Sequence, residues 1–150
     1  MSARWCLWLG ALFGGLGVGS GAFAAHGLSG YFQTKYADQT RVVAGETIPL
    51  ARKYLGDFKT GAEYQLTHAL ALLAVGLLAD RRPSRWCRIA GISFTLGILL
   101  FSGSLYGLTL LGIPVLGAIT PLGGVAFLVG WGSLAMAALE VRTTLSDPAV

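Results

Sequence analysis

Four apolar runs, each long enough to cross a lipid bilayer, occupy most of this chain of 150 residues. A transmembrane helix needs about 20 predominantly apolar residues, because the hydrocarbon core is about 30 Å thick and each helical residue rises about 1.5 Å. We place the predicted spans at residues 5–25, 62–79, 89–111 and 122–139. The pattern predicts an all-α integral membrane four-helix bundle, with residues 1–150 forming a single membrane domain.

The composition excludes an ordinary soluble domain. The chain is 54% hydrophobic and 12% charged, whereas about 25% of the residues of a soluble domain are charged. Its 22 glycines also fit a membrane protein, because small residues let membrane helices approach closely. The basic residues are not interleaved with stacking aromatic residues on a polar surface, so we expect no nucleic-acid partner.

The first apolar run has a competing interpretation as a cleaved secretory signal. Arg4 would supply its basic start, and residues 22–24 resemble a cleavage site. The run is long for such a signal, however, and contains glycines spaced four residues apart, such as Gly10 and Gly14. Pairs of this kind suit a helix that is retained and packs closely on another. We favour a retained span, and cleavage stays the alternative.

Residues 27–59 form the only long polar segment, and their charges are of mixed sign. Thr47 is expected to cap a short helix with Pro49 in its first turn. The apolar residues that follow share one face at helical spacing: Leu50, Tyr54, Leu55 and Phe58. We predict an amphipathic interfacial helix between spans one and two. A solvated loop with a few buried anchors is the alternative.

Positive charge gathers in the short link between the second and third spans, at Arg81, Arg82, Arg85 and Arg88. With four spans, Arg4 and Arg142 lie on the same side as this link, and the link between spans three and four has no charge. Basic loops stay on the cytoplasmic side of a membrane. We therefore expect a multi-pass protein of the bacterial inner (plasma) membrane with both termini in the cytoplasm.

Four segments resemble the motifs of a known family. They are GAFAAHGL (21–28), TGAEYQLTHALALL (60–73), LFSGSLYGL (100–108) and ITPLGGVAFLVGW (119–131). In this order and spacing they resemble the domain of unknown function 423 family, small inner-membrane proteins similar to transmembrane protein 256. The resemblance implies four spans and assigns no biochemical activity. The chain departs from the family at Ala24, where glycine is usual, and in residues 31–57, which are longer than is common.

Polar side chains inside the spans are the candidate functional residues. Ionisable groups cost a few kcal/mol to insert in a membrane, and such groups mark functional sites by default. Counting residues inward from the outer end of each span places seven polar side chains in the outer half of the bundle. By this count, His68 lies level with Ser102 and Ser104. The predicted cluster consists of His26, Glu63, Tyr64, His68, Ser102, Ser104 and Tyr106.

Several chemistries fit this cluster. Histidine titrates near neutral pH, so Glu63 and His68 are candidates for a relay in a proton, ion or small-solute transporter or channel. His26, His68 and Glu63 could form a zinc or iron site with an open coordination position. The sequence lacks the close ligand spacing that makes such a site specific. The unequal depths of His26 and His68 argue against haem ligation. We predict no metal and no cofactor. Alternatively, the same groups bond to one another and hold the helices together.

The function predicted from the sequence is an accessory or scaffold component of the inner membrane with a structural polar cluster. The small size and the glycine-rich faces favour this interpretation. We predict no enzyme, because Ser102 and Ser104 lack the G-x-S-x-G pattern of a nucleophile elbow. The expected partners are membrane lipid and either other membrane-protein subunits or a second copy of the chain. A transporter or channel, which would need an oligomer, is the alternative function.

Overall fold

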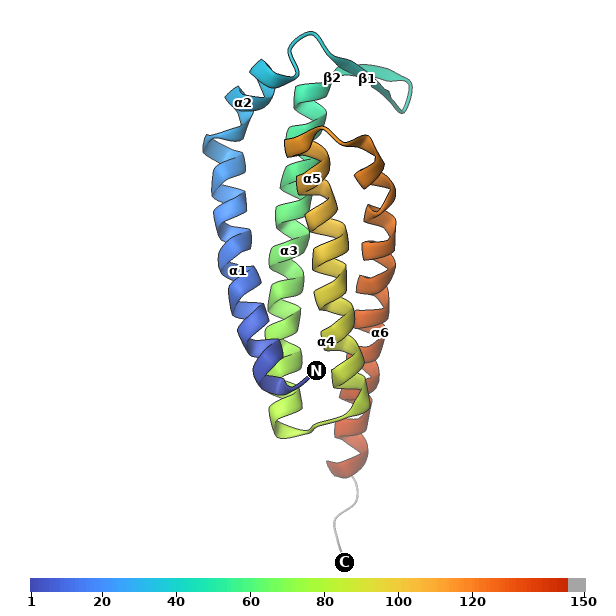
Figure 1. Cartoon of the computed structure of the whole chain (residues 1–150). Helices are drawn as coiled ribbons and strands as arrows, with labels where there is room; N and C mark the ends of the chain where they lie inside the picture. Colours follow the sequence, from blue (N-terminus) through green and yellow to red (C-terminus); the bar gives the residue numbers. More distant parts are fainter. Residues whose placement is uncertain (146–150) are drawn as a thin grey trace, which may run out of the picture.

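Four long helical rods make up the protein (Figure 1). The computed structural model describes the backbone of residues 1–145 and the side chains of residues 1–140, so the Arg142 side chain lies outside it. The rods are α1 (Ala3–His26), α3 (Leu50–Arg81), the continuous series α4 (Arg85–Gly97), η1 (Ile98–Ser102) and α5 (Gly103–Leu111), and α6 (Thr120–Leu145). Each rod contains a segment long and apolar enough to cross a membrane. The predicted all-α bundle is confirmed, and it contains four helical rods that are candidate membrane spans.

Each rod packs mainly on the next one along the chain. α1 packs along α3, α3 packs on the α4–η1–α5 rod, and α6 packs along α4 and η1. α1 and α6 therefore lie on opposite sides of the two central rods (Figure 1). This open arrangement leaves one groove between α3 and α6, and a second between α1 and α5.

Close packing between α1 and α3 depends on glycine. A Cβ atom at Gly10 or Gly17 would lie 2.9 Å from the side chain of Leu73 or Leu66 of α3, respectively. By contrast, a Cβ atom at Gly15 would meet nothing within 4 Å. The predicted close approach of glycine faces is thus present on the side of α1 that meets α3, and the opposite side is open.

The polar segment between α1 and α3 contains a short helix and a β-hairpin. α2 (Leu28–Lys35) is followed by the antiparallel strands β1 (Thr40–Val43) and β2 (Glu46–Pro49). The two turn residues, Ala44 and Gly45, both have positive φ angles (51° and 86°), as the tight turn of a two-residue hairpin requires. The hairpin projects from one end of the bundle, the end opposite to the start of α1 (Figure 1).

The predicted helix over residues 50–58 is present and continues into the second span as the first turns of α3. The expected cap at Thr47 is wrong, because Thr47 pairs in β2 and α3 begins at Leu50 without a side-chain cap. Tyr54 and Phe58 on the predicted apolar face are buried against α2 and α5. The amphipathic pattern therefore reflects packing against protein on that face.

α2 and the residue after it close the C-terminal end of α5, where the last backbone carbonyls of a helix need partners. Tyr36 Oη donates to the backbone oxygen of Thr109 at 2.7 Å, and Lys35 Nζ donates to that of Leu110. Lys35 Nζ also bonds to Tyr31 Oη at 3.2 Å, and this hydrogen bond raises the pKa of Lys35. The short helix between spans one and two is thus fixed to the bundle.

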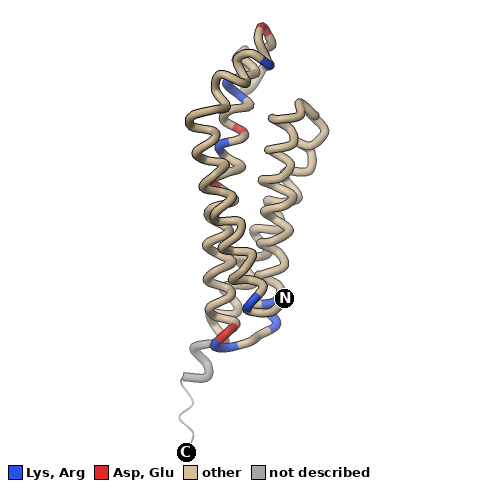
Figure 2. The backbone as a smooth tube through the Cα atoms, turned by 60° about the vertical axis from the view of Figure 1, so that its left-hand side comes forward, with Lys and Arg blue, Asp and Glu red and all other residues tan. Residues whose placement is uncertain are grey.

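Charged residues lie toward the two ends of the bundle (Figure 2). The arginines of the α3–α4 link and of the start of α1 gather at one end, and the charges of the hairpin and the first turns of α3 lie toward the other. α3 has three acidic residues: Asp57 in its first turns, Asp80 at its far end, and Glu63, which lies between them. Glu63 is therefore a charged residue within a candidate span, which makes it a candidate functional residue.

Candidate functional site

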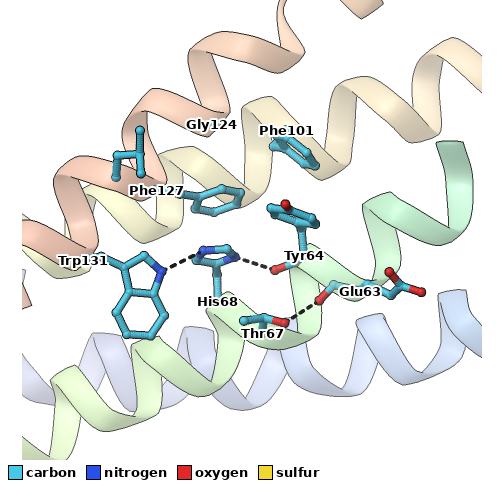
Figure 3. A pocket seen from close by; sticks show the side chains of 9 residues that line it. Glu63, Tyr64, Thr67, His68, Phe101, Gly124, Phe127 and Trp131 are labelled. Carbon is cyan, nitrogen blue, oxygen red and sulfur yellow. Dashed lines mark hydrogen bonds between the residues drawn. The ribbon is translucent and has the colours of Figure 1, made fainter.

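His68 lies buried in the middle of α3, with 4% of its surface exposed. Its Nδ1 atom is 2.7 Å from the backbone oxygen of Tyr64, one turn earlier. A carbonyl oxygen only accepts, so Nδ1 carries a proton. Trp131 of α6 donates its indole N–H to His68 Nε2 at 3.2 Å (Figure 3). An indole N–H only donates, so His68 is the neutral tautomer protonated at Nδ1.

Aromatic rings surround this hydrogen-bonded pair and connect three rods. Phe127 of α6 stacks on the His68 ring, with ring centroids 3.4 Å apart and planes 8° from parallel. Tyr64 stacks on Phe101 of η1 at 4.5 Å. α3, η1 and α6 therefore meet through aromatic contacts, and the His68–Trp131 hydrogen bond adds a polar link between α3 and α6.

The groove between α3 and α6 has a volume of about 580 Å³. Figure 3 shows the Glu63 carboxylate turned away from His68. Among residues 1–140, whose side chains are described, no lysine, arginine or histidine forms an ion pair with Glu63. The groove is lined by Glu63, Tyr64, Thr67, His68, Phe101, Gly124, Phe127, Leu128 and Trp131.

His68 lies farther from the hairpin end of the bundle than the sequence count predicts. The count places it level with Ser102 and Ser104, but its ring packs against Phe94 and Phe127. The reason is that α3 begins well outside the level where α5 ends. Gly61 of α3 already packs against Leu105, six residues before the end of α5.

Tyr106 belongs to a different polar group, at the groove between α1 and α5. Its hydroxyl donates to Gln65 Oε1 at 2.9 Å, and Gln65 Nε2 donates to the backbone oxygen of Phe13 at 2.8 Å. This chain of bonds joins α5, α3 and α1. Sequence reasoning missed Gln65, although an uncharged amide inside a span was a usable signal.

The remaining predicted residues are also separate from His68. Ser104 Oγ bonds to Thr120 Oγ1 of α6 at 2.8 Å. Ser102 Oγ is fully buried and has no hydrogen-bond partner among the described residues. His26 is exposed at the end of α1. The expected convergence of all seven residues is therefore corrected: Glu63, Tyr64 and His68 share one groove, while the other four lie elsewhere.

Helical geometry explains this division. Residues on one helix share a face when they are three or four positions apart, which holds for Tyr64 and His68. Ser104 and Tyr106 are two positions apart on α5, so they point to different neighbours. Similarly, Gln65 is next to Tyr64 on α3 and contacts α1 and α5. Depth alone, without the facing direction, could not predict which side chains meet.

The site does not have the geometry of a metal centre. In the described part of the chain, no three histidine, cysteine, aspartate or glutamate side chains are close enough together to hold a metal ion. The two nitrogens of His68 already have partners in Tyr64 and Trp131. The arrangement can instead fix α6 against α3, and Glu63 is among the residues that line the groove with aromatic walls.

These features define a small helical membrane protein with polar and aromatic links between its helices. The family model described as "Protein of unknown function (DUF423)" matches residues 20–124. The chain therefore belongs to this family, which confirms the resemblance found in the sequence motifs.

Curated relatives cover nearly the whole chain. The UPF0382 membrane protein YwdK of Bacillus subtilis is 44% identical over 133 residues, which are 88% of this chain and 94% of the relative. A UPF0382 membrane protein of Haemophilus influenzae is 41% identical and covers 89% and 92% of the two chains. The UPF0382 inner membrane protein YgdD of Escherichia coli is 35% identical and covers 95% of each. No solved structure matches the chain significantly.

Proposed function

We propose that the protein is a non-enzymatic accessory or scaffold component of the bacterial inner membrane, in which buried polar groups hold the helices together. The observation that carries this proposal is that both ring nitrogens of His68 are bonded within the protein, to Tyr64 and Trp131. These two bonds support a packing role for His68, because they join α6 to α3 and use both ring nitrogens within the protein. The Tyr106–Gln65 and Ser104–Thr120 bonds support the same role for the other polar groups.

The alternative of a proton or solute pathway requires Glu63 and His68 to exchange a proton. The Glu63 carboxylate points away from His68, and no hydrogen bond joins the two side chains. A relay would therefore have to break the Trp131 bond and turn Glu63 around. For this reason we favour the structural role for His68.

The proposed orientation has both termini in the cytoplasm. The arginines Arg81, Arg82, Arg85 and Arg88, together with Arg4, lie at one end of the bundle, which positive-inside counting assigns to the cytoplasm. The hairpin would then face outward. The inner-membrane location is supported by the E. coli relative, which is named an inner membrane protein.

Replacing His68 by alanine tests the structural role. We expect His68→Ala to lower the stability by about 2–4 kcal/mol, because it removes a buried ring and leaves the Trp131 N–H without its acceptor. His26→Ala is the matched control, since His26 is exposed at the end of α1, and its stability should equal that of the parent. Thermal unfolding in mild detergent measures both.

A flux assay in proteoliposomes separates the two functions. We expect neither the parent nor the His68→Ala variant to conduct protons above the level of empty vesicles. If the parent showed a pH-dependent flux that His68→Ala abolished without loss of stability, the structural role would be wrong.

Native purification in mild detergent, with identification of bound proteins, lipids and metals by mass spectrometry, tests the accessory role. A membrane-protein partner in constant ratio is the expected result, and its repeated absence would contradict that role.

A further inference from the structure

Glu63 is an unpaired carboxylate in the wall of the α3–α6 groove. Lys59 precedes it by one helical turn, yet the ion pair present on this part of α3 is Lys53–Asp57. Within the described side chains, no cation lies within ion-pair distance of the Glu63 carboxylate. The backbone carbonyl oxygen of Glu63 accepts a hydrogen bond from Thr67 Oγ1 at 2.9 Å.

The neighbours of Glu63 show how far inside the bundle it lies. Gly61 packs against Leu105, and Tyr64 stacks on Phe101. These two residues are six and ten positions before Leu111, the end of α5. At about 1.5 Å per residue, Glu63 lies between roughly 9 and 15 Å inward from that end. A carboxylate at such a depth is costly unless a positive charge meets it.

The walls of the groove suit a cation with an apolar body. Tyr64 and Trp131 expose 43% and 46% of their surfaces, and both rings line the groove, together with Phe101 and Phe127. Aromatic faces attract cations within about 6 Å of the ring centre. The volume of about 580 Å³ falls in the range of roughly 300–1,000 Å³ that is usual for small-molecule sites.

We propose that the groove between α3 and α6 binds an organic cation, with its positive charge beside Glu63 and its apolar body against Tyr64 and Trp131. A bare metal ion does not fit, because Glu63 has no companion ligands among the described residues. The open side of the groove between the two rods gives an apolar molecule access. Binding there leaves the His68–Trp131 hydrogen bond in place, so the proposal is independent of the accessory role.

Binding of tetraphenylphosphonium to the full chain tests the proposal. Equilibrium dialysis in dodecyl maltoside near pH 8, above the ordinary carboxylate range, compares protein with empty micelles. We expect saturable binding to the parent and an affinity about tenfold or more lower for Glu63→Gln, since about 1.4 kcal/mol of lost attraction corresponds to tenfold. Neutral triphenylphosphine oxide should not compete.

Two further variants act as controls. Glu46→Gln removes an exposed carboxylate of the hairpin and should bind like the parent. Gly124→Leu should block the groove while keeping Glu63, because Gly124 lines the groove and has open space around it. Absence of saturable binding by the parent overturns the proposal. An affinity of Glu63→Gln equal to that of the parent also overturns the proposal. If Glu63→Gln does not fold, an affinity of Gly124→Leu equal to that of the parent overturns it instead.

Discussion

Two serines on the third rod show how strongly the role of a residue depends on its direction. Ser104 bonds across to Thr120 of α6, whereas Ser102, two positions earlier, is fully buried without a hydrogen-bond partner among the described residues. Ser102 is the last residue of η1, a π-helical turn, where the usual bond from a serine hydroxyl to the carbonyl four residues earlier is absent. The two hydroxyls therefore contribute oppositely to stability.

Alanine substitutions at Ser102 and Ser104 should change the stability of the protein in different directions. Ser104→Ala should lower the stability by about 0.6–1.7 kcal/mol, the range of hydrogen bonds between membrane helices. Ser102→Ala should leave it unchanged or raise it, because an unsatisfied buried hydroxyl costs about 1–3 kcal/mol. Unfolding of the purified variants in mixed micelles, followed by circular dichroism, measures both. A larger loss for Ser102→Ala than for Ser104→Ala would show that Ser102 has a partner.

At this scale the sequence predicts residue types better than it predicts contacts. Glu63, Tyr64 and His68 do share a groove, because the i, i+4 spacing of Tyr64 and His68 gives them one face of α3 and Glu63 lies beside Tyr64 at its edge. Tyr106 and Ser104 could not be placed, since their partners depend on how α5 is rotated against α3 and α6. Rotation is determined by packing, which a single sequence does not specify.

At the scale of the elements, adjacent glycines on α6 have different roles. A Cβ atom at Gly123 would lie 2.4 Å from the backbone nitrogen of Phe101, so α6 touches the η1 backbone directly at this point. A Cβ atom at Gly124 would meet nothing within 4 Å. Both residues occur in the same motif, yet only Gly123 is required for the close approach of the two rods.

Alanine at each position provides a matched pair. Gly123→Ala should lower the stability by about 1–3 kcal/mol, because backbone atoms cannot move aside as a flexible side chain can. Gly124→Ala should be neutral or slightly stabilising, since alanine has the higher helix propensity. Thermal unfolding in detergent compares them directly, and equal effects of the two substitutions would contradict the packing of α6 on η1.

The β-hairpin, like the short helix α2, was not predicted from the sequence. Its strands contain β-branched residues at Thr40, Val42, Val43, Thr47 and Ile48, which favour strands. The turn, Ala44–Gly45, lacks the asparagine or aspartate that usually marks such a hairpin. Mixed charges around these positions gave the appearance of a solvated loop. The helix over residues 50–58, by contrast, was predictable because its apolar face repeats at helical spacing.

The architecture of the whole molecule follows from the length of its four apolar runs and from the positions of its charged residues. Both features can be read directly from the sequence. The four candidate spans and the helical class were predicted because apolar runs of this length have few folded solutions other than membrane helices. The family was predicted from four sequence motifs. The open order of the rods was not predicted, because it results from contacts such as Gly17 with Leu66 rather than from any local pattern. That open order creates the groove in which Glu63 and His68 lie.

His68 links α3 to α6 as a neutral imidazole. Nitrogen NMR of the full chain, labelled in histidine and held in lipid nanodiscs at neutral pH, reports the protonation of each ring nitrogen. We expect His68 to carry its proton on Nδ1, with an unprotonated Nε2 that accepts from Trp131. Trp131→Phe should change the Nε2 signal and leave that of the exposed His26 unchanged. A His68 protonated on Nε2, or on both nitrogens, would contradict the claim.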